Sequence, residues 1–305
     1  GVNKIFLGQD LTRGLGCGGN PEVGRKAAES SLDDIYEILQ GANMVFIAAG
    51  MGGGTGTGAA PIVAQVAKDL GALTIAIVTR PFSFEGEKRR KNAIEGINKL
   101  KENVDAIIIV SNDKLMMMNG TRPISEAFAE SDRVLAQSVK TITDLIVVPG
   151  VINLDFADVR STLKDKGLAL IGFGSGTGPK KANDAASSAL LSPLLEASIH
   201  GAHSIIANVT CGNNVSLDEV KEAIDYVTSA AGNNPNIIFG VQANPELNDQ
   251  MLISIVATEF DNDFDPFSEN ATPVVTPVTP LKEEQVEEDD GEEESILPSF
   301  LNGND

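Results

Sequence analysis

The sequence predicts an α/β protein with a parallel sheet, a long central helix, a smaller α+β domain and a disordered acidic tail. Three observations lead to this fold class. Strands that are apolar throughout alternate with amphipathic helices between residues 25 and 111. A second set of helices and strands follows a long amphipathic segment, and the apolar pattern stops at residue 261. Strict alternation with fully apolar strands is typical of a parallel sheet covered on both faces.

The length and composition allow two packed domains. The chain has 305 residues, of which 42% are apolar. Its 23 basic and 43 acidic residues give a net charge of -20, which argues against binding nucleic acid or an anionic membrane surface. Cys17 and Cys211 cannot form a disulfide framework, so we expect a cytoplasmic protein. No apolar run approaches the roughly 20 residues that span a bilayer, so no direct membrane insertion is expected.

The first half of the chain begins at Gly1, without a methionine, and residues 2–7 could form a strand or a loop edge. The first clear helix has Leu32, Ile35 and Leu39 on one face and ends at Gly41. The elements predicted after it are a strand at 44–48, a helix at 57–70, a strand at 73–78, a helix at 88–101 and a strand at 106–110.

The second half of the chain begins with a helix from residue 125 to about 146. Its apolar residues recur at helical spacing, and it is long enough to bridge two domains. The elements predicted after Pro149 and Gly150 are helices at 156–166, 181–199 and 217–230 and strands at 168–173, 204–209, 236–241 and 251–258.

The last 45 residues differ in character from the rest. Residues 261–294 contain three Thr-Pro pairs, 13 acidic residues and a single lysine, so this stretch carries -12 of the total charge. It cannot bury enough apolar surface to offset its ordering entropy, which predicts a disordered linker. Apolar residues return at Ile296, Leu297, Phe300 and Leu301. We interpret residues 296–301 as a peptide that docks on a partner, although a frayed end would look similar.

The strongest chemical pattern lies between the strand at 44–48 and the next helix. Six of the nine residues from 50 to 58 are glycine, and two of the others are Thr55 and Thr57. Glycines let backbone N–H groups converge on phosphate oxygens, and the following helix adds the positive end of its dipole. A plain strand-to-helix turn would need only one or two glycines. The pattern therefore predicts a nucleotide-binding loop.

The spacing separates this loop from two common phosphate loops. The P-loop pattern is absent, because Gly58 is followed by alanine rather than lysine. The dinucleotide pattern survives only as Gly54, Gly56 and Ala59, and Arg80 occupies the place of the expected acidic residue. A nicotinamide-dependent oxidoreductase is the alternative that this weak match leaves open.

The run Gly-Gly-Gly-Thr-Gly-Thr-Gly at 52–58 resembles the signature loop of the tubulin/FtsZ superfamily, and the similarity extends over nearly the whole chain. The resemblance implies a Rossmann-like GTPase domain that binds GTP and GDP, with Mg²⁺ expected beside the triphosphate. Residues 14–24 look like the family's third nucleotide loop, near the terminal phosphate, with Cys17 and Gly19 where alanine is usual. From these two loops the implied nucleotide contacts are Gly18, Gly19, Asn20, Gly52, Gly53, Gly54, Thr55, Gly56, Thr57 and Gly58.

The resemblance assigns four further side chains to the nucleoside. Residues 78–86 are similar to the loop whose glutamate, with the arginine four residues on, lies near the ribose, which implies Glu85 and Arg89. It implies that Phe128 stacks on guanine and that Asp132 accepts hydrogen bonds from the base. From spacing alone, Glu85 and Asp132 would be surface charges and Phe128 a core residue.

A second chemical pattern lies where the second domain opens. Asp155 is a good helix N-cap and Asp158 suits the first helical turn, so capping explains either residue alone. In the family this segment is the synergy loop, which enters the nucleotide pocket of the next subunit. The resemblance therefore implies catalytic roles for Asn153, Asp155 and Asp158, with hydrolysis that depends on head-to-tail assembly. A carboxylate within hydrogen-bond reach can orient and deprotonate the attacking water.

The resemblance also implies how the chain is organised. The predicted parts are a GTP-binding domain at 1–124, a central helix at 125–148, an α+β domain with the synergy loop at 149–260, an acidic linker at 261–294 and a docking peptide at 295–305. The family's first strand, first phosphate loop and first helix are missing, so we expect weakened GTP turnover from this chain. The expected partners are further copies of the chain and, through residues 296–301, membrane-tethering or regulatory division proteins at mid-cell.

Two readings compete with a filament-forming GTPase. One is the oxidoreductase above, and the other is a filament or adaptor protein that binds nucleotide without hydrolysing it. The two aspartates argue against the second of these. His200 and His203 could in principle ligate a metal, but no further ligands accompany them, so no metal site is predicted.

Overall fold

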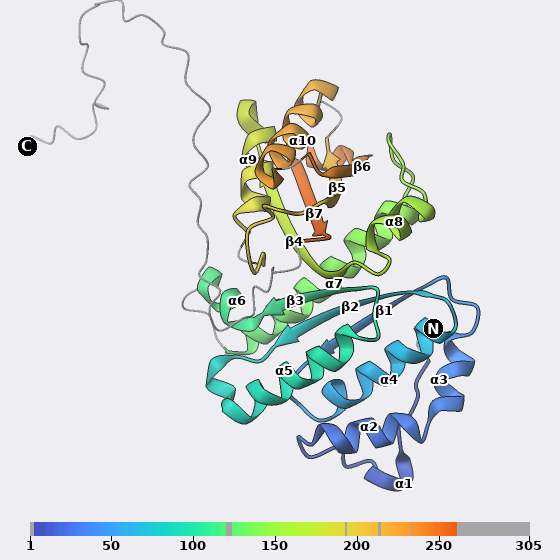
Figure 1. Ribbon diagram of the computed structural model, residues 1–305. Helices are drawn as coiled ribbons and strands as arrows, with labels where there is room; N and C mark the ends of the chain where they lie inside the picture. Colours follow the sequence, from blue (N-terminus) through green and yellow to red (C-terminus); the bar gives the residue numbers. More distant parts are fainter. Residues whose placement is uncertain (1–2, 120–123, 193, 213–214, 233, 261–305) are drawn as a thin grey trace, which may run out of the picture. The chain divides into compact units, whose positions relative to one another are not determined.

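A computed structural model describes residues 3–119, 124–192, 194–212, 215–232 and 234–260 (Figure 1). The predicted acidic linker and docking peptide lie outside these residues. The helices are α1 Gln9–Thr12, α2 Pro21–Glu29, α3 Leu32–Leu39, α4 Thr55–Asp69, α5 Glu87–Lys101, α6 Asn112–Asn119, α7 Ile124–Val147, α8 Phe156–Leu163, α9 Lys181–Leu190 and α10 Leu217–Ala231. Short 3₁₀ helices are η1 Ser83–Glu85, η2 Gly178–Lys180 and η3 Pro245–Leu247.

The described strands form one seven-stranded sheet in the order β1-β2-β3-β4-β7-β5-β6. They are β1 Met44–Gly50, β2 Leu73–Arg80, β3 Ala106–Ser111, β4 Gly167–Gly176, β5 Ser204–Cys211, β6 Asn236–Ala243 and β7 Met251–Thr258. Strands β1 to β4 are parallel, and β7 runs antiparallel to both of its neighbours. The two halves of the chain join where β3 and β4 pair over only three residues each. The domain boundary at residue 148 stays a prediction.

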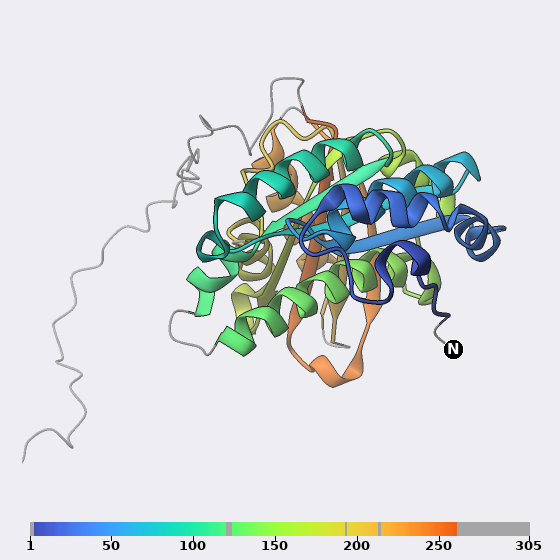
Figure 2. The same ribbon diagram turned by 90° about the horizontal axis from the view of Figure 1, so that it is seen from below.

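Alternating side chains of the strands point into different helix layers. Ala76 and Val78 of β2 pack with α4 and α5, whereas Ile75 and Ile77 pack with α7 and α8. In the second half, α9 and α10 pack on β4, β5 and β7. Figure 2 shows α5 in teal and α7 in green on opposite sides of the strands. The predicted sheet with helices on both faces is therefore present.

The structure corrects several predicted boundaries. Residues 3–6 are irregular, and α1, α2 and α6 were not predicted. The helix predicted at 181–199 ends at Leu190, because the proline at 193 disfavours helical backbone at the residue before it. The helix predicted at 156–166 ends at Leu163, because Lys164 is extended and Asp165 has a φ of 55°. No helix in the described part of the chain is long and apolar enough to cross a membrane.

Candidate functional site

The glycine-rich loop joins the carboxyl end of β1 to the first turn of α4. Met51 donates its N–H to Thr79 O at 2.9 Å, and Gly52 donates to Thr57 Oγ1 at 2.9 Å. From Gly53 to Thr57, five consecutive N–H groups donate no hydrogen bond within the described part of the chain. These groups include the orphan donors of a helix N-terminus, and they form a ready-made anion site.

The N-terminus of α2 lies next to the glycine-rich loop and the first turn of α4. A Cβ atom at Gly58 would lie 2.0 Å from Pro21 O, and one at Gly54 would lie 3.0 Å from Asn20 N. On the other side, a Cβ atom at Gly24 would lie 2.3 Å from Gly54 O. Glycine at these positions lets the two helices pack backbone against backbone. The positive ends of two helix dipoles therefore lie next to the five free amides.

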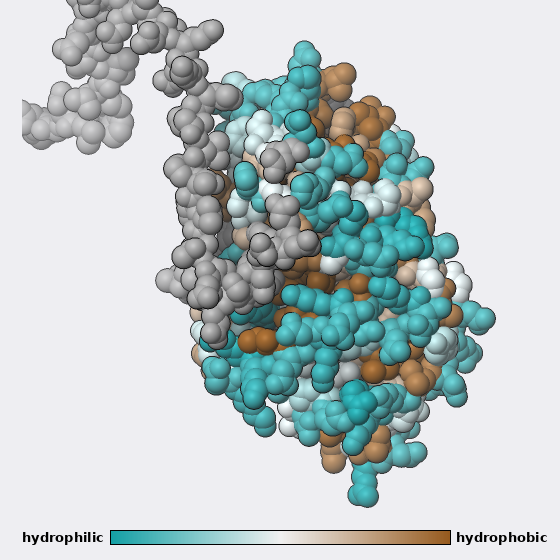
Figure 3. Space-filling model, viewed as in Figure 1, coloured by the Kyte–Doolittle hydropathy of each residue, from teal (hydrophilic) through white to brown (hydrophobic). Residues whose placement is uncertain are grey.

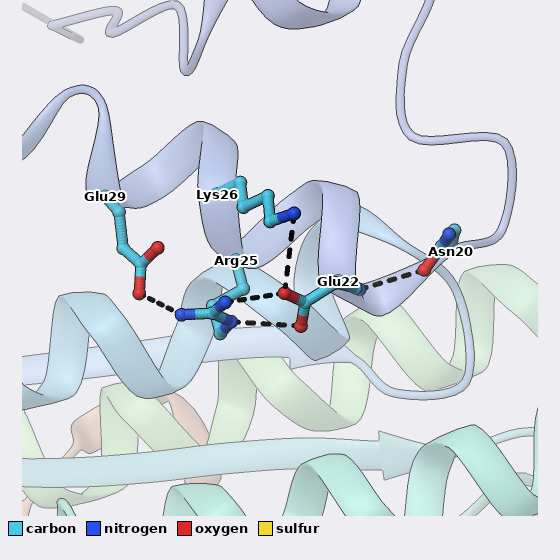
Figure 4. Close-up of polar contacts among 5 residues, drawn as sticks. All are labelled: Asn20, Glu22, Arg25, Lys26 and Glu29. Carbon is cyan, nitrogen blue, oxygen red and sulfur yellow. Dashed lines mark hydrogen bonds and ion pairs between the residues drawn. The ribbon is translucent and has the colours of Figure 1, made fainter.

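Helix α2 is capped and its first-turn charge is neutralised. Asn20 Oδ1 accepts a hydrogen bond from Glu22 N at 3.0 Å, which makes Asn20 the N-cap (Figure 4). Arg25 donates two hydrogen bonds to the Glu22 carboxylate and pairs with Glu29, while Lys26 Nζ lies 3.9 Å from Glu22 (Figure 4). The bond from Arg25 lowers the pKa of Glu22. The negative charge of Glu22 is thus paired with cations.

The loop before α2 faces the glycine-rich loop. Gly18 and Gly19 have φ values of 56° and 71°, and both residues are exposed. Cys17 is half-buried, and its Sγ accepts a hydrogen bond from Thr55 Oγ1 at 3.3 Å. The cysteine therefore contacts the helix that follows the glycine-rich loop.

The predicted ribose residues form an ion pair at the start of α5. Glu85 Oε1 accepts a hydrogen bond from Phe82 N at 2.9 Å, and Glu85 Oε2 accepts one from Arg89 Nη1 at 2.5 Å. The Glu85 side chain is only 12% exposed, whereas that of Arg89 is 57% exposed. The glutamate is held in the loop while the guanidinium remains accessible.

The predicted base residues lie on the first turns of α7. The ring of Phe128 meets that of Phe82 edge to face, with centroids 5.0 Å apart, and Phe128 remains 43% exposed. Phe82 stacks in turn on Phe84. Asp132 is exposed and lines an open groove of about 580 Å³ together with Ala48 of β1. An exposed aromatic face and an exposed carboxylate one turn apart suit a planar, hydrogen-bonding base.

Two residues that directly follow β3 hydrogen-bond to α7 and to the loop that carries Glu85. The sequence patterns did not single them out. The buried Asn112 accepts a hydrogen bond from Ser131 of α7 through Oδ1. Asp113 Oδ1 accepts one from Ser83 N at 2.9 Å. The signal that could have found these residues is their place at the end of a buried parallel strand, where ligands of α/β sheets bind.

The predicted catalytic aspartates form a capping box. Asp155 Oδ1 accepts from Asp158 N at 2.8 Å, and Asp158 Oδ2 accepts from Asp155 N at 3.2 Å. Asn153 Oδ1 accepts from Gly150 N at 2.6 Å, which fixes the preceding turn. Asp155 is exposed and Asp158 is half-buried. Capping therefore uses one oxygen of each carboxylate, and the other oxygen accepts no hydrogen bond within the described part of the chain.

The aspartates do not join the other predicted site residues. Phe128 and Asp132 lie on the first turns of α7, and the loop with Asn153 follows its last turn. With 24 residues, α7 is about 36 Å long at 1.5 Å per residue. Within one chain, Phe128 thus packs on Phe82 of the ribose loop and Asp132 lines a groove with Ala48 at the end of β1, whereas Asp155 and Asp158 follow the other end of α7.

Family models match both halves of the chain. Residues 1–120 match the GTPase domain of the Tubulin/FtsZ family, and residues 167–261 match the C-terminal domain of the FtsZ family. The chain belongs to the FtsZ family. It is therefore a tubulin-like, nucleotide-binding GTPase of the cytoskeletal type, and the oxidoreductase alternative is not favoured.

Solved FtsZ structures support this membership. An empty FtsZ dimer from M. jannaschii is 42% identical over 83% of this chain and 74% of its own, with a TM-score of 0.78. The W319Y mutant of the same organism's FtsZ is 42% identical over 83% of this chain and 76% of its own, with a TM-score of 0.79. CetZ2 from Haloferax volcanii, a GTPγS-bound protofilament, shares the fold at 22% identity and a TM-score of 0.68, over 86% of this chain and 80% of its own.

The comparisons leave the individual site residues as predictions. The glycine loops, the ribose and base residues and the three synergy-loop residues keep the roles that the resemblance implies. Among the described residues, no group of three or more His, Cys, Asp or Glu side chains could hold a metal ion.

Proposed function

We propose that this protein hydrolyses GTP at sites completed between neighbouring subunits of a head-to-tail filament, and that these filaments form the bacterial cell-division ring. One observation carries the proposal. The nucleotide loops and the aspartates lie at opposite ends of a helix about 36 Å long, so one chain cannot bring them together. A second chain, placed end to end, can supply what the first one lacks.

The binding half of the site holds the nucleotide through backbone and side chains. The amides from Gly53 to Thr57 and the N-termini of α2 and α4 bind the phosphates. Glu85 and Arg89 contact the ribose. Phe128 stacks on guanine, and Asp132 accepts from its ring N–H and exocyclic amino group, which adenine does not present in that arrangement.

Magnesium fits this half through the nucleotide. Mg²⁺ commonly binds substrate phosphates and keeps several of its waters, so it does not require a dedicated set of protein ligands. When bound, it would neutralise phosphate charge. The chain's own contribution is to hold the phosphates in place with the amides of the glycine loop.

The catalytic half acts on water. The carboxylate oxygens of Asp155 and Asp158 that capping does not use are available to a neighbouring pocket, where they orient a water molecule toward the γ-phosphate and accept its proton. Asn153 fixes the loop that carries them. Loss of the γ-phosphate then weakens the contact between subunits, so assembly and hydrolysis regulate each other.

Relatives support assembly. The similar FtsZ of M. jannaschii has been solved as a dimer and the CetZ2 of Haloferax volcanii as a protofilament. We further propose a cytoplasmic protein at mid-cell, with residues 296–301 as the docking peptide for membrane-tethering or regulatory division proteins.

A mixing experiment tests the shared site. Asp158→Ala keeps a complete nucleotide pocket, and the double variant F128A/D132A keeps the aspartates. Each protein alone should hydrolyse GTP slowly. Mixed at equal concentration, they should recover a substantial fraction of wild-type turnover, because some contacts pair an intact pocket with intact aspartates.

The matched control mixes D158A with D155A, which both lack part of the same loop and should show no recovery. A mixture of D158A with F128A/D132A that is no faster than the sum of its components, although both proteins are folded and co-assemble, contradicts the shared site. A wild-type protein that binds GTP no better than ATP contradicts the proposed function itself.

A further inference from the structure

We propose that Asn92 is a positioning residue that aims a backbone amide of the glycine-rich loop at the nucleotide phosphates. The inference rests on the proposed function and adds a residue that the sequence patterns did not single out. Asn92 lies on α5, and its side chain contacts both glycine loops.

The Asn92 amide bridges two loops that are distant in sequence. Its Nδ2 donates to Gly19 O at 3.3 Å and to Gly52 O at 3.3 Å. Both acceptors are carbonyl oxygens, so only the NH₂ side of the amide can satisfy them. Asn92 thus joins the loop before α2 to the loop before α4.

The bond to Gly52 O fixes the direction of the next amide. In a trans peptide, the carbonyl and the following N–H point in opposite directions. Because Gly52 O points toward Asn92, the N–H of Gly53 points away from α5. That N–H donates no hydrogen bond within the described part of the chain, and a Cβ atom at Gly53 would meet nothing within 4 Å. The N–H of Gly53 is therefore free to donate to a phosphate oxygen, and the space beside this residue is open.

The preceding peptide is fixed as well. Gly52 N donates to Thr57 Oγ1 at 2.9 Å, so side chains hold both peptides that flank Gly52. Gly52 itself has a φ of 106°, a conformation that L side chains rarely adopt. Without the bond from Asn92, the peptide between Gly52 and Gly53 could rotate and present its carbonyl to the phosphate, which would repel the anion.

The packing of α5 places Asn92 within reach. A Cβ atom at Gly52 would lie 2.8 Å from Arg89 O, and one at Gly96 would lie 2.3 Å from Thr57 Cγ2. These two close approaches lie about one turn on either side of Asn92, so the backbone of α5 is held against the loop. Residues 87–91 are exposed, and Figure 3 shows a largely hydrophilic surface over this helix. Asn92, which is half-buried, is the first residue of α5 that turns inward.

The test compares ligands with and without phosphates. Asn92→Ala removes the donor, and Asn92→Asp replaces it with an acceptor of nearly the same shape. Affinity for GTP and GDP is measured by calorimetry, and affinity for guanosine by competition with a fluorescent GTP analogue. We expect GTP and GDP to bind about tenfold more weakly to N92A and more weakly still to N92D. Guanosine, which has no phosphate, should bind as it does to wild type.

Two controls separate positioning from folding and charge. Asn98→Asp makes the same change at an exposed position of α5 and should leave all three affinities unchanged. Asn92→Gln keeps the donor and should recover part of the loss. If N92A does not fold, as judged by thermal unfolding, N92Q and Asn92→Ser are compared instead.

The outcomes distinguish this inference from the proposed function. GTP affinity of N92A within twofold of wild type overturns the role of Asn92, and so does an equal loss for guanosine. A wild-type chain that does not bind GTP overturns the proposed function. Selective loss of the phosphate-bearing ligands supports the inference.

Discussion

The two halves of the proposed site are built in different ways. The binding half is a set of backbone amides, from Gly53 to Thr57, held by close packing of α2, α4 and α5. The proposed catalytic half is a pair of carboxylates, Asp155 and Asp158, which within the described part of the chain accept hydrogen bonds only from each other's backbone N–H groups. The first half depends on tertiary structure and the second on a local capping box.

This difference predicts how substitutions in each half affect stability and turnover. Amides positioned by packing are preorganised before the ligand arrives, and any atom added between the helices disturbs them. Carboxylates in a surface capping box carry little structural load, so chemistry can be removed there without unfolding the protein. Substitutions of the aspartates should therefore lower turnover without lowering stability, whereas a substitution in the glycine loop should lower stability wherever the added atom meets a packed helix.

The largest effect is expected at Asp158. In Asp158→Asn an amide oxygen can still accept from Asp155 N, so the capping box is kept, but the charge and the base are lost. Turnover of assembled protein should fall about 100-fold or more, which is the usual contribution of a general base. GTP affinity and the free energy of unfolding should stay at wild-type values. Steady-state phosphate release and urea unfolding measure the two quantities, and unchanged turnover would remove the catalytic role.

The next effect contrasts two glycines of one loop. Gly58→Ala forces a Cβ atom against Pro21 O and should destabilise the fold by about 1–3 kcal/mol while weakening GTP binding. Gly53→Ala adds its methyl group to open space, so the free energy of unfolding should change by less than about 0.5 kcal/mol. GTP affinity should nevertheless fall roughly tenfold, because the methyl group occupies the space beside the free amides. Equal stability of the two variants would contradict the packing account.

A charge cluster in the C-terminal half should make the stability of the fold depend on pH. Lys181, with a side chain that is 7% exposed, lies 2.9 Å from Glu219 and 2.7 Å from Asp249. Its hydrogen bonds lower the pKa of both carboxyl groups from their ordinary 4.5 and 3.8. Stability from a lowered carboxyl pKa is present above the ordinary value and is lost as pH falls through the lowered one. The cluster should therefore stabilise the fold above about pH 4.5 and lose this effect in acid.

Lys181→Met tests that sign. The free energy of unfolding, measured in urea, should differ less between pH 7 and pH 3.5 in the variant than in wild type. Lys221→Met is the matched control, because Lys221 and Asp225 form an exposed pair on α10, and it should leave the difference unchanged. A wild-type protein that gains stability on acidification would refute the expected direction.

The smallest effect is expected at Cys17. Its Sγ accepts a weak hydrogen bond from Thr55, and the thiol is half-buried. Cys17→Ala should change GTP affinity by less than about twofold, because a thiol is a poor acceptor. A larger loss, measured by the same calorimetry, would show that the side chain takes part in nucleotide binding.

Much of the sheet could be predicted from the sequence because its strands are apolar on both faces. Strand β7 matches its predicted bounds at Met251 and Thr258, and six of its eight residues are buried. Helix α2 was missed because small residues, Gly24, Ala27 and Ala28, make its buried face and give a weak apolar pattern. Asn20 as N-cap, followed by proline, was the available signal.

The ribose residues of the candidate site came from the family resemblance, and their roles stay predictions. Glu85 ends η1 and Arg89 lies in the first turn of α5, and the two residues, four apart in sequence, form an ion pair. Asn92 was not predictable, because its role arises from Gly96 and Gly52, which let α5 approach a loop 40 residues away in the chain. A side chain whose role depends on a contact between distant segments shows no characteristic spacing in the sequence.

Turnover per subunit as a function of protein concentration tests the central claim most directly. The shared site predicts that specific GTPase activity is very low in dilute, monomeric samples and rises above a threshold concentration at which sedimentation detects assembly. Specific activity that is constant from monomer to filament would contradict it, because a single chain would then contain every group that hydrolysis requires.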